Sequence, residues 1–216
     1  MIAIIDYGMG NLWSVKRKMD RIEADSVITS DEKEIRSCEK IILPGVGHFA
    51  TAVSEIKKRG LWDLLYEQVI IEGKYILGIC LGMQLMAHHS EEGDSEGFGW
   101  IDAEVIRFKI EDLRLKIGDS RLKIADGRLK IPHVGWNTLE KVKDSPLFMN
   151  IDMRSEFYFV HSYHIRCNNP ENILAETVYG YPFVSAVNKD NIFGVQFHPE
   201  KSHDAGEMLL KNFVNL

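Results

Sequence analysis

The stretch that decides the fold is Tyr75-Ile76-Leu77-Gly78-Ile79-Cys80-Leu81-Gly82-Met83-Gln84. Its first five residues form a short apolar run, which predicts a buried strand. Cys80 follows directly, with one glycine two positions before it and another two positions after it. We expect a helix from Leu81 to His89. A cysteine at such a strand-to-helix junction has the pattern of a nucleophile elbow, with sulfur in place of a serine oxygen.

The chain before this stretch alternates between predicted strands and predicted helices. Ile2 to Ile5 and Lys40 to Leu43 are short, β-rich runs, whereas Leu12 to Ala24 and Leu61 to Glu72 carry apolar residues at helical spacing. Such alternation predicts an α/β fold in which a mostly parallel central sheet has helices on both faces.

The chain after about Gly99 has a different pattern, with successive strands and few helices. We expect this half to form a mixed or antiparallel extension of the same sheet. A last amphipathic helix is predicted from His203 to Val214. The strands predicted here are Asp102 to Phe108, Phe157 to His161, Phe183 to Asn188 and Ile192 to Phe197.

Length and composition indicate one ordinary globular domain over residues 1–216. The net charge of -6 argues against a nucleic-acid or anionic-membrane surface. The longest apolar run is far too short to span a bilayer, and Met1 leads straight into the first predicted strand without a basic segment. We therefore expect a cytoplasmic protein with small-molecule or protein partners.

Three cysteines, Cys38, Cys80 and Cys167, argue against both a disulfide framework and a zinc site, because their number is odd and their spacing is not that of metal ligands. The adjacent pair His88 and His89 would point apart on a helix. Neither a Walker-type loop nor a Rossmann fingerprint is present. We expect no metal and no cofactor.

A tandem repeat of seven residues occupies the region from about 112 to 131. Its copies begin at Asp112, Asp119 and Asp126, and each contains Arg-Leu-Lys-Ile. A heptad period suggests a coiled coil, but the alternation within Leu-Lys-Ile and the Asp-Gly or Gly-Asp breaks fit short strands and turns better. A surface hairpin or mobile loop made by local duplication is favoured over a dedicated functional element.

The predicted turn at Cys80 would place the sulfur at the carboxyl edge of the sheet, because the flanking glycines allow the backbone to approach closely. The start of the helix there favours a thiolate, and the backbone N–H of Leu81 can point at a developing oxyanion. The alternative is a buried structural cysteine, which is the commoner role of a single cysteine. The strand, glycines and helix together favour a nucleophile.

A base for this nucleophile is available in Phe197-His198-Pro199-Glu200. Residues two apart on an extended segment project to the same side, so the carboxylate of Glu200 can hold the imidazole of His198 in one tautomer. Such a pair alone is weak evidence and would more often be a surface coincidence. Together with the elbow, it indicates a catalytic triad.

A second oxyanion donor is predicted in the turn Pro44-Gly45-Val46-Gly47, which follows the strand Lys40 to Leu43. The alternative is a plain strand-to-helix connection.

These motifs resemble those of the class I, triad-type glutamine amidotransferases. Two further segments resemble the glutaminase subunit of imidazole glycerol phosphate synthase, and the similarity runs from Met1 to Leu216. The two extra copies of the repeat are a departure from the family. The class-level segments are Leu43 to Gly47, Gly78 to Gln84 and Gln196 to Ser202, and the subunit-level segments are Ile5 to Leu12 and Pro132 to Asn137.

The resemblance implies a flavodoxin-like fold and assigns a role to each triad residue. Cys80 would attack the side-chain amide of L-glutamine and form a thioester. His198 would protonate the departing ammonia and then activate water, while Glu200 orients it. Gly47 and Leu81 would stabilise the oxyanion.

The resemblance also implies contacts for the rest of the substrate. Gln84 and Glu96 would hold the amino-acid end of glutamine, and the segment from Val160 to Tyr163, with His161 and Ser162, would line the site. His161 has an alternative reading as a hydrogen-bonded core histidine.

A partner is implied because ammonia is mostly protonated in neutral water and then cannot act as a nucleophile. In this family the consumer is a cyclase with a (β/α)8 barrel, and the two chains form a heterodimer. The residues expected at the docking surface are Met9, Asn11, Pro132, His133, Trp136 and Asn137. Trp136 could instead be a core aromatic. We hypothesise that the repeat, which ends beside this surface, perturbs docking or coupling.

Three other functions stay open at this point. The chain could be a paralogous glutaminase subunit that feeds a sugar amidotransferase of surface-polysaccharide synthesis. It could be a catalytically silent subunit that only activates its partner, which the intact triad disfavours. It could be a stand-alone cysteine peptidase or hydrolase, in which Gln84, Glu96 and the docking motifs would have no role.

Overall fold

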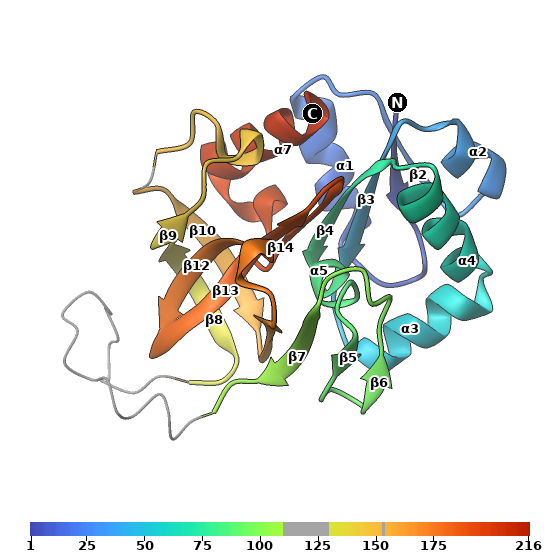
Figure 1. Ribbon diagram of the computed structural model, residues 1–216. Coiled ribbons are helices and arrows are strands. Elements are labelled where there is room, and N and C mark those ends of the chain that lie inside the picture. Colours follow the sequence, from blue (N-terminus) through green and yellow to red (C-terminus); the bar gives the residue numbers. More distant parts are fainter. Residues whose placement is uncertain (110–129, 153) are drawn as a thin grey trace.

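A central sheet organises the molecule (Figure 1). The computed structural model describes residues 1–109, 130–152 and 154–216. Five parallel strands lie in the order β2-β1-β3-β4-β14, which is the flavodoxin-like order. Their bounds are β1 (Ile2–Ile5), β2 (Ser26–Thr29), β3 (Lys40–Gly45), β4 (Tyr75–Cys80) and β14 (Ile192–Val195).

A mixed extension continues the sheet from β14, as expected, and all of its pairs are antiparallel except the parallel pair of β5 with β7. It begins with β13 and β11 and continues through β7, β5 and β6, while β12 and β9 branch from β13. These strands are β5 (His89–Ser90), β6 (Ser95–Glu96), β7 (Ala103–Arg107), β9 (Lys141–Val142), β11 (Tyr163–Cys167), β12 (Ile173–Tyr179) and β13 (Tyr181–Lys189). The strand predicted at Phe157 to His161 exists, but it belongs to a separate antiparallel pair, β8 (His133–Thr138) with β10 (Glu156–His161).

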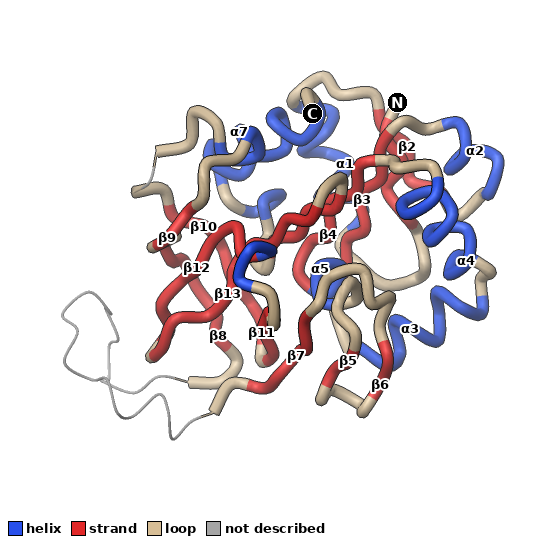
Figure 2. The backbone as a smooth tube through the Cα atoms, in the orientation of Figure 1, coloured by secondary structure: helices blue, strands red, loops and turns tan. Residues whose placement is uncertain are grey.

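Helices cover both faces of the parallel part (Figure 2). Helices α1 (Leu12–Arg21) and α7 (His203–Val214) pack on one face. Helices α2 (Glu32–Ser37), α3 (Phe49–Lys58) and α4 (Leu61–Tyr66) pack on the other, followed by a turn of π-helix at Glu67–Ile71. Short 3₁₀ turns lie at Pro146–Phe148, Pro170–Asn172 and Pro199–Lys201.

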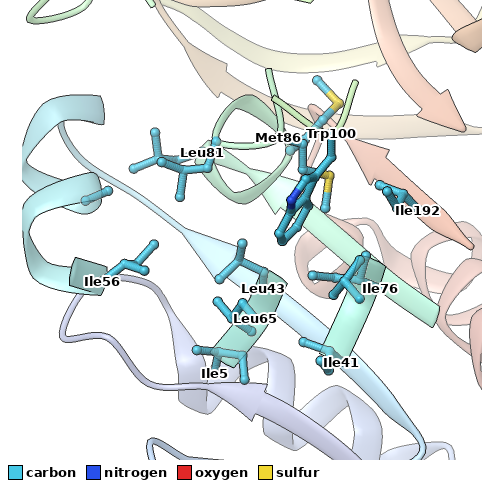
Figure 3. Close-up of a cluster of buried hydrophobic side chains, with 14 of the residues drawn as sticks. Ile5, Ile41, Leu43, Ile56, Leu65, Ile76, Leu81, Met86, Trp100 and Ile192 are labelled. Carbon is cyan, nitrogen blue, oxygen red and sulfur yellow. The ribbon is translucent and has the colours of Figure 1, made fainter. Parts of the chain in front are cut away.

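The two-residue period of the strands divides the core between these faces. On β1, Ala3 and Ile5 join the cluster under α2, α3 and α4, whereas Ile2 and Ile4 join the cluster under α1 and α7. Figure 3 shows the first cluster, where Ile5, Ile41 and Leu43 meet helix side chains. Continuous apolar runs are required because both faces of these strands are buried.

The helix predicted from Leu81 to His89 is wrong beyond its first turn, because α5 spans only Leu81–Gln84. The carbonyl groups that would continue the helix bond elsewhere. Leu85 O accepts from Phe98 N at 2.8 Å, Met86 O from Ile101 N at 3.0 Å and Ala87 O from Gly99 N at 3.0 Å. These tertiary hydrogen bonds replace the helical ones and turn the chain into β5.

Most of the tandem repeat at about 112–131 lies outside the described residues, so its expected hairpin or loop stays a prediction, as does a single domain over 1–216. No described helix has the length and apolarity that crossing a bilayer requires.

Candidate active site

Cys80 ends β4 with φ 55° and ψ -110°, a conformation that non-glycine residues rarely adopt. Its flanking glycines allow this turn to pack. A Cβ atom at Gly82 would overlap the carbonyl oxygen of Leu43, and one at Gly78 would lie 2.7 Å from the backbone of Gly82. The elbow therefore exists, and sterics explain its glycines.

His198 and Glu200 form a buried pair beside the sulfur. Glu200 Oε1 accepts from His198 Nδ1 at 2.9 Å, and the two side chains are only 2% and 1% exposed. Burial lowers the pKa of His198, but the Cys80 sulfur and the Glu200 carboxylate outweigh burial and raise this pKa to about 10. The structure thus brings together the three residues predicted as a triad.

The remaining nitrogen of this imidazole, His198 Nε2, is buried and has no hydrogen-bond partner among the described residues. Nδ1 is already occupied by Glu200, so Nε2 is the atom available for exchange of a proton with sulfur or substrate. The ring and the sulfur are close enough to interact, although they lack hydrogen-bond geometry in this conformation. Such contacts commonly tighten only when substrate binds.

A cavity of about 350 Å³ opens over the sulfur. Its size suits a small polar molecule, and it lies at the carboxyl edge of the parallel strands, where α/β sheets bind ligands. Five of the predicted substrate or oxyanion residues line it. The lining consists of Val46, Gly47, Cys80, Leu81, Gln84, Glu92, Pro132, Val160, His161, Ser162 and Tyr163.

Glu96 was predicted to hold the substrate, but it is exposed on β6 opposite His89 and is not among the lining residues. Glu92 lines the cavity instead and accepts from Phe49 N, at the start of α3, at 2.9 Å. The early end of α5 moves this region into a hairpin. The expectation for Glu96 came from the family resemblance, whereas this hairpin brings Glu92 to the cavity.

His161 lines the cavity and is also fully hydrogen-bonded. Its Nδ1 donates to the Tyr163 carbonyl at 2.8 Å, so its Nε2 must accept from His133 Nδ1 at 3.1 Å. Burial lowers the pKa of His133 to about 3 and that of His161 well below its ordinary value. His161 is therefore a buried, hydrogen-bonded histidine in the cavity wall, and its ring has no free nitrogen for proton transfer.

The residues expected at a docking surface differ in exposure. Trp136 is 41% exposed and stacks on His203 with ring centroids 4.6 Å apart, so it is not a core aromatic. Met9 and Asn11 are half-buried, and Pro132 is exposed. His133 is 2% exposed, so its side chain cannot form the expected contact in this conformation. Asn137 is half-buried and donates to Val178 O at 2.9 Å.

Gln196 was not predicted as a site residue. It is fully buried, and its Nε2 lies 3.5 Å from the Cys80 sulfur. Its position two residues before His198 was an available signal, because alternate residues of an extended segment share a side.

Comparison with known proteins agrees with this geometry. The family model for glutamine amidotransferase class-I matches residues 3–216. An imidazole glycerol phosphate synthase subunit HisH 2 of Methanococcus maripaludis is 45% identical, covering 99% of this chain and 98% of its own length. A subunit HisH 2 of Pseudomonas aeruginosa is 43% identical, and a subunit HisH of Leptospira interrogans is 39% identical, each over the full length of both chains.

Solved structures share the fold at low identity. The crystal structure of a glutamine amidotransferase has a TM-score of 0.69 at 15% identity, covering 100% of this chain and 100% of that one. A chain of PurLQS from Thermotoga maritima has a TM-score of 0.66 at 17% identity, covering 99% and 97%. The chain belongs to the class I glutamine amidotransferases and, within them, to the family of the imidazole glycerol phosphate synthase subunits HisH.

Proposed function

We propose that this chain is the glutaminase subunit of an imidazole glycerol phosphate synthase in histidine biosynthesis, hydrolysing L-glutamine to glutamate and ammonia. The observation that carries the proposal is the buried His198–Glu200 pair beside Cys80. Cys80 ends β4 and lines the cavity. A thiol nucleophile, a base and an orienting carboxylate in this order are the parts that acyl transfer requires.

The first half of the reaction begins when the Cys80 thiolate attacks the amide carbon of glutamine. The backbone N–H groups of Leu81 and Gly47 stabilise the oxyanion that forms. The C–N bond then breaks, protonated His198 delivers its proton to the departing nitrogen, and ammonia leaves behind a thioester on Cys80.

The second half hydrolyses this thioester. Neutral His198 accepts a proton from water as the water oxygen bonds to the acyl carbon. The C–S bond breaks, its electron pair returns to sulfur, and glutamate leaves. Glu200 stabilises the imidazolium at both stages, because it accepts the hydrogen bond from Nδ1.

The amino-acid end of glutamine is assigned to the far side of the cavity. We place its α-ammonium near Glu92, which is the only lining carboxylate among the described residues. Gln84 and Ser162 supply further polar contacts. This assignment replaces Glu96 and is supported by the exposure of Glu96 outside the cavity.

The partner in this proposal is a cyclase subunit with a (β/α)8 barrel, which receives ammonia in a one-to-one heterodimer. The names of the relatives, which are synthase subunits, support a partner subunit. Two exposed tryptophans, Trp13 at 70% and Trp136 at 41%, are the kind of anchor that protein interfaces use.

The test is a glutaminase assay of the purified chain with and without the cyclase and its nucleotide ligand. We expect glutamate release from glutamine, low for the lone chain and raised by the liganded cyclase. Cys80→Ala should abolish glutamine-dependent product but leave ammonia-dependent product unchanged. If both kinds of product persist in this variant, the triad proposal is wrong.

A genetic experiment separates this pathway from a paralogous role in sugar amidation. Expression of the chain should restore growth without histidine to a strain that lacks its synthase glutaminase subunit. Glutamine hydrolysis without such rescue would favour the sugar amidotransferase reading.

A further inference from the structure

The carbonyl oxygen of Tyr163 accepts two hydrogen bonds in the wall of the cavity. His161 Nδ1 lies 2.8 Å from it, and the Gln84 side-chain amide lies 3.0 Å from it. A carbonyl oxygen can only accept, so the Gln84 atom that faces it must be the nitrogen. This backbone group therefore fixes the orientation of the Gln84 amide.

The fixed amide of Gln84 in turn orients the amide of Gln196. Gln84 Nε2 also lies 3.0 Å from the Gln196 side chain, and its two hydrogens serve its two neighbours. Because Gln84 donates here, the Gln196 atom that it meets is the oxygen. The other end of that amide, which lies 3.5 Å from the Cys80 sulfur, is therefore the nitrogen.

Burial preserves this arrangement. Gln196 is 0% exposed and Gln84 is 4% exposed, so water has little access to either amide. Gln196 N also donates to Ser185 O at 2.9 Å, directly after β14, and β14 pairs with β4, which carries Cys80. The backbone of the neighbouring strand therefore holds the side-chain nitrogen of Gln196, Nε2, beside the sulfur.

We propose that Gln196 is a further catalytic residue, whose side-chain N–H stabilises negative charge on the Cys80 sulfur. A hydrogen bond to an ionised acceptor is stronger than one to a neutral acceptor, so this contact favours thiolate over thiol. In the proposed reaction it also assists thioester breakdown, when the C–S electron pair returns to sulfur. That second role rests on the proposed function, whereas the effect on the ionisation of the Cys80 thiol in the absence of substrate does not.

The experiment measures alkylation of Cys80 by iodoacetamide against pH, in the intact chain without glutamine. Peptide mass spectrometry separates Cys80 from Cys38 and Cys167. Gln196→Met preserves side-chain length and removes the donor. We expect the midpoint of the pH–rate profile to move upward by about one pH unit, since charged hydrogen bonds have roughly this strength.

Gln84→Met is the second variant. It leaves Gln196 in place but removes the donor that orients it, so we expect a smaller upward movement of the midpoint. Gln68→Met is the matched control, because Gln68 is 3% exposed and its backbone contacts Lys74, just before the opposite end of β4. Its midpoint should equal that of the wild type.

An unchanged midpoint in folded Gln196→Met overturns the proposal. If that variant does not fold, Gln84→Met decides alone, and an unchanged midpoint there overturns it equally. A shifted midpoint in a chain that never hydrolyses glutamine would support the Gln196 contact and reject the proposed function.

Discussion

Glu200 differs from an exposed carboxylate because nearly all of its side chain is buried against one imidazole. A buried charge is tolerated only when it is paired, and His198 provides that partner at 2.9 Å. The pair therefore serves chemistry and constrains stability at once. Both consequences can be tested at single residues.

Glu200→Gln should lower kcat for glutamine hydrolysis by about 10³- to 10⁴-fold, with a much smaller change in KM. The neutral amide cannot stabilise imidazolium and can impose the wrong tautomer, which in a comparable triad costs about this much. Steady-state assays with the partner present check the prediction. A loss of less than about tenfold would show that Glu200 does not orient the base.

The His198–Glu200 pair also predicts a pH dependence of stability. The pKa of His198 is raised from 6.5 to about 10 in the folded chain, so the folded chain keeps a proton that the unfolded chain releases. This contribution to stability is complete below pH 6.5 and is lost as pH rises towards 10. Denaturant unfolding at several pH values should show this fall, and Glu200→Gln should flatten it.

At the scale of elements, the strand-to-helix turn between β4 and α5 depends on both the local sequence and tertiary contacts. Gly82 is required by the close approach of β3, because the Leu43 carbonyl fills the space beside it, and Gly78 is required by the backbone of Gly82. The length of α5 is decided by the segment from Phe98 to Ile101, which takes the next carbonyl groups. The first feature could be anticipated from spacing, and the second could not.

Gly82→Ala should lower the free energy of unfolding by about 3 kcal/mol, because the added methyl group forces the elbow away from β3. Gly73→Ala is the control. Gly73 also has a positive φ, 69°, but has open space around it, so we expect a loss of about 1 kcal/mol from backbone strain alone. Equal losses in urea titrations would mean that packing at the elbow is loose.

At the scale of the whole molecule, Lys130, near the end of the tandem repeat, is connected to the cavity wall through Tyr179 and His133. Tyr179 OH accepts from Lys130 N at 3.2 Å and donates to Lys130 O at 2.7 Å. The Tyr179 ring stacks on His133, with centroids 3.9 Å apart, and His133 bonds to His161 in the cavity. Pro132 lines the cavity itself. The chain that follows the repeat is therefore part of the site.

Deleting residues 112–125 removes two copies of the repeat and leaves this anchored segment intact. We expect the free energy of unfolding to stay within about 0.5 kcal/mol of the wild type, since the length of a surface hairpin or loop, the form predicted for the repeat, has little effect on stability. Partner affinity or the coupled rate should change, because the repeat ends beside the expected docking surface. Calorimetric titration with the cyclase and a coupled assay measure both, and no change in either would contradict the hypothesis.

Much of the parallel sheet could be predicted, because buried strands are read from local apolar runs. The predicted strands at β1, β3 and β4 match within two residues, and α7 matches at both ends. Strand β2 and helices α2 and α3 were missed. Ser26–Thr29 is half-buried at the sheet edge, and α2 is a single short element capped by Asp31, which accepts from Glu34 N. Short segments carry little periodic signal.

The sequence by itself determined the nucleophile turn and the pairing of His198 with Glu200, since glycine sterics and the two-residue period are local properties of the chain. Only the tertiary structure decided that Glu92 rather than Glu96 faces the cavity and that His161 Nε2 is hydrogen-bonded to His133. It also decided that Gln196 presents nitrogen to sulfur. These depend on hydrogen bonds between residues far apart in the chain, and a donor has no defined direction until folding supplies its acceptor.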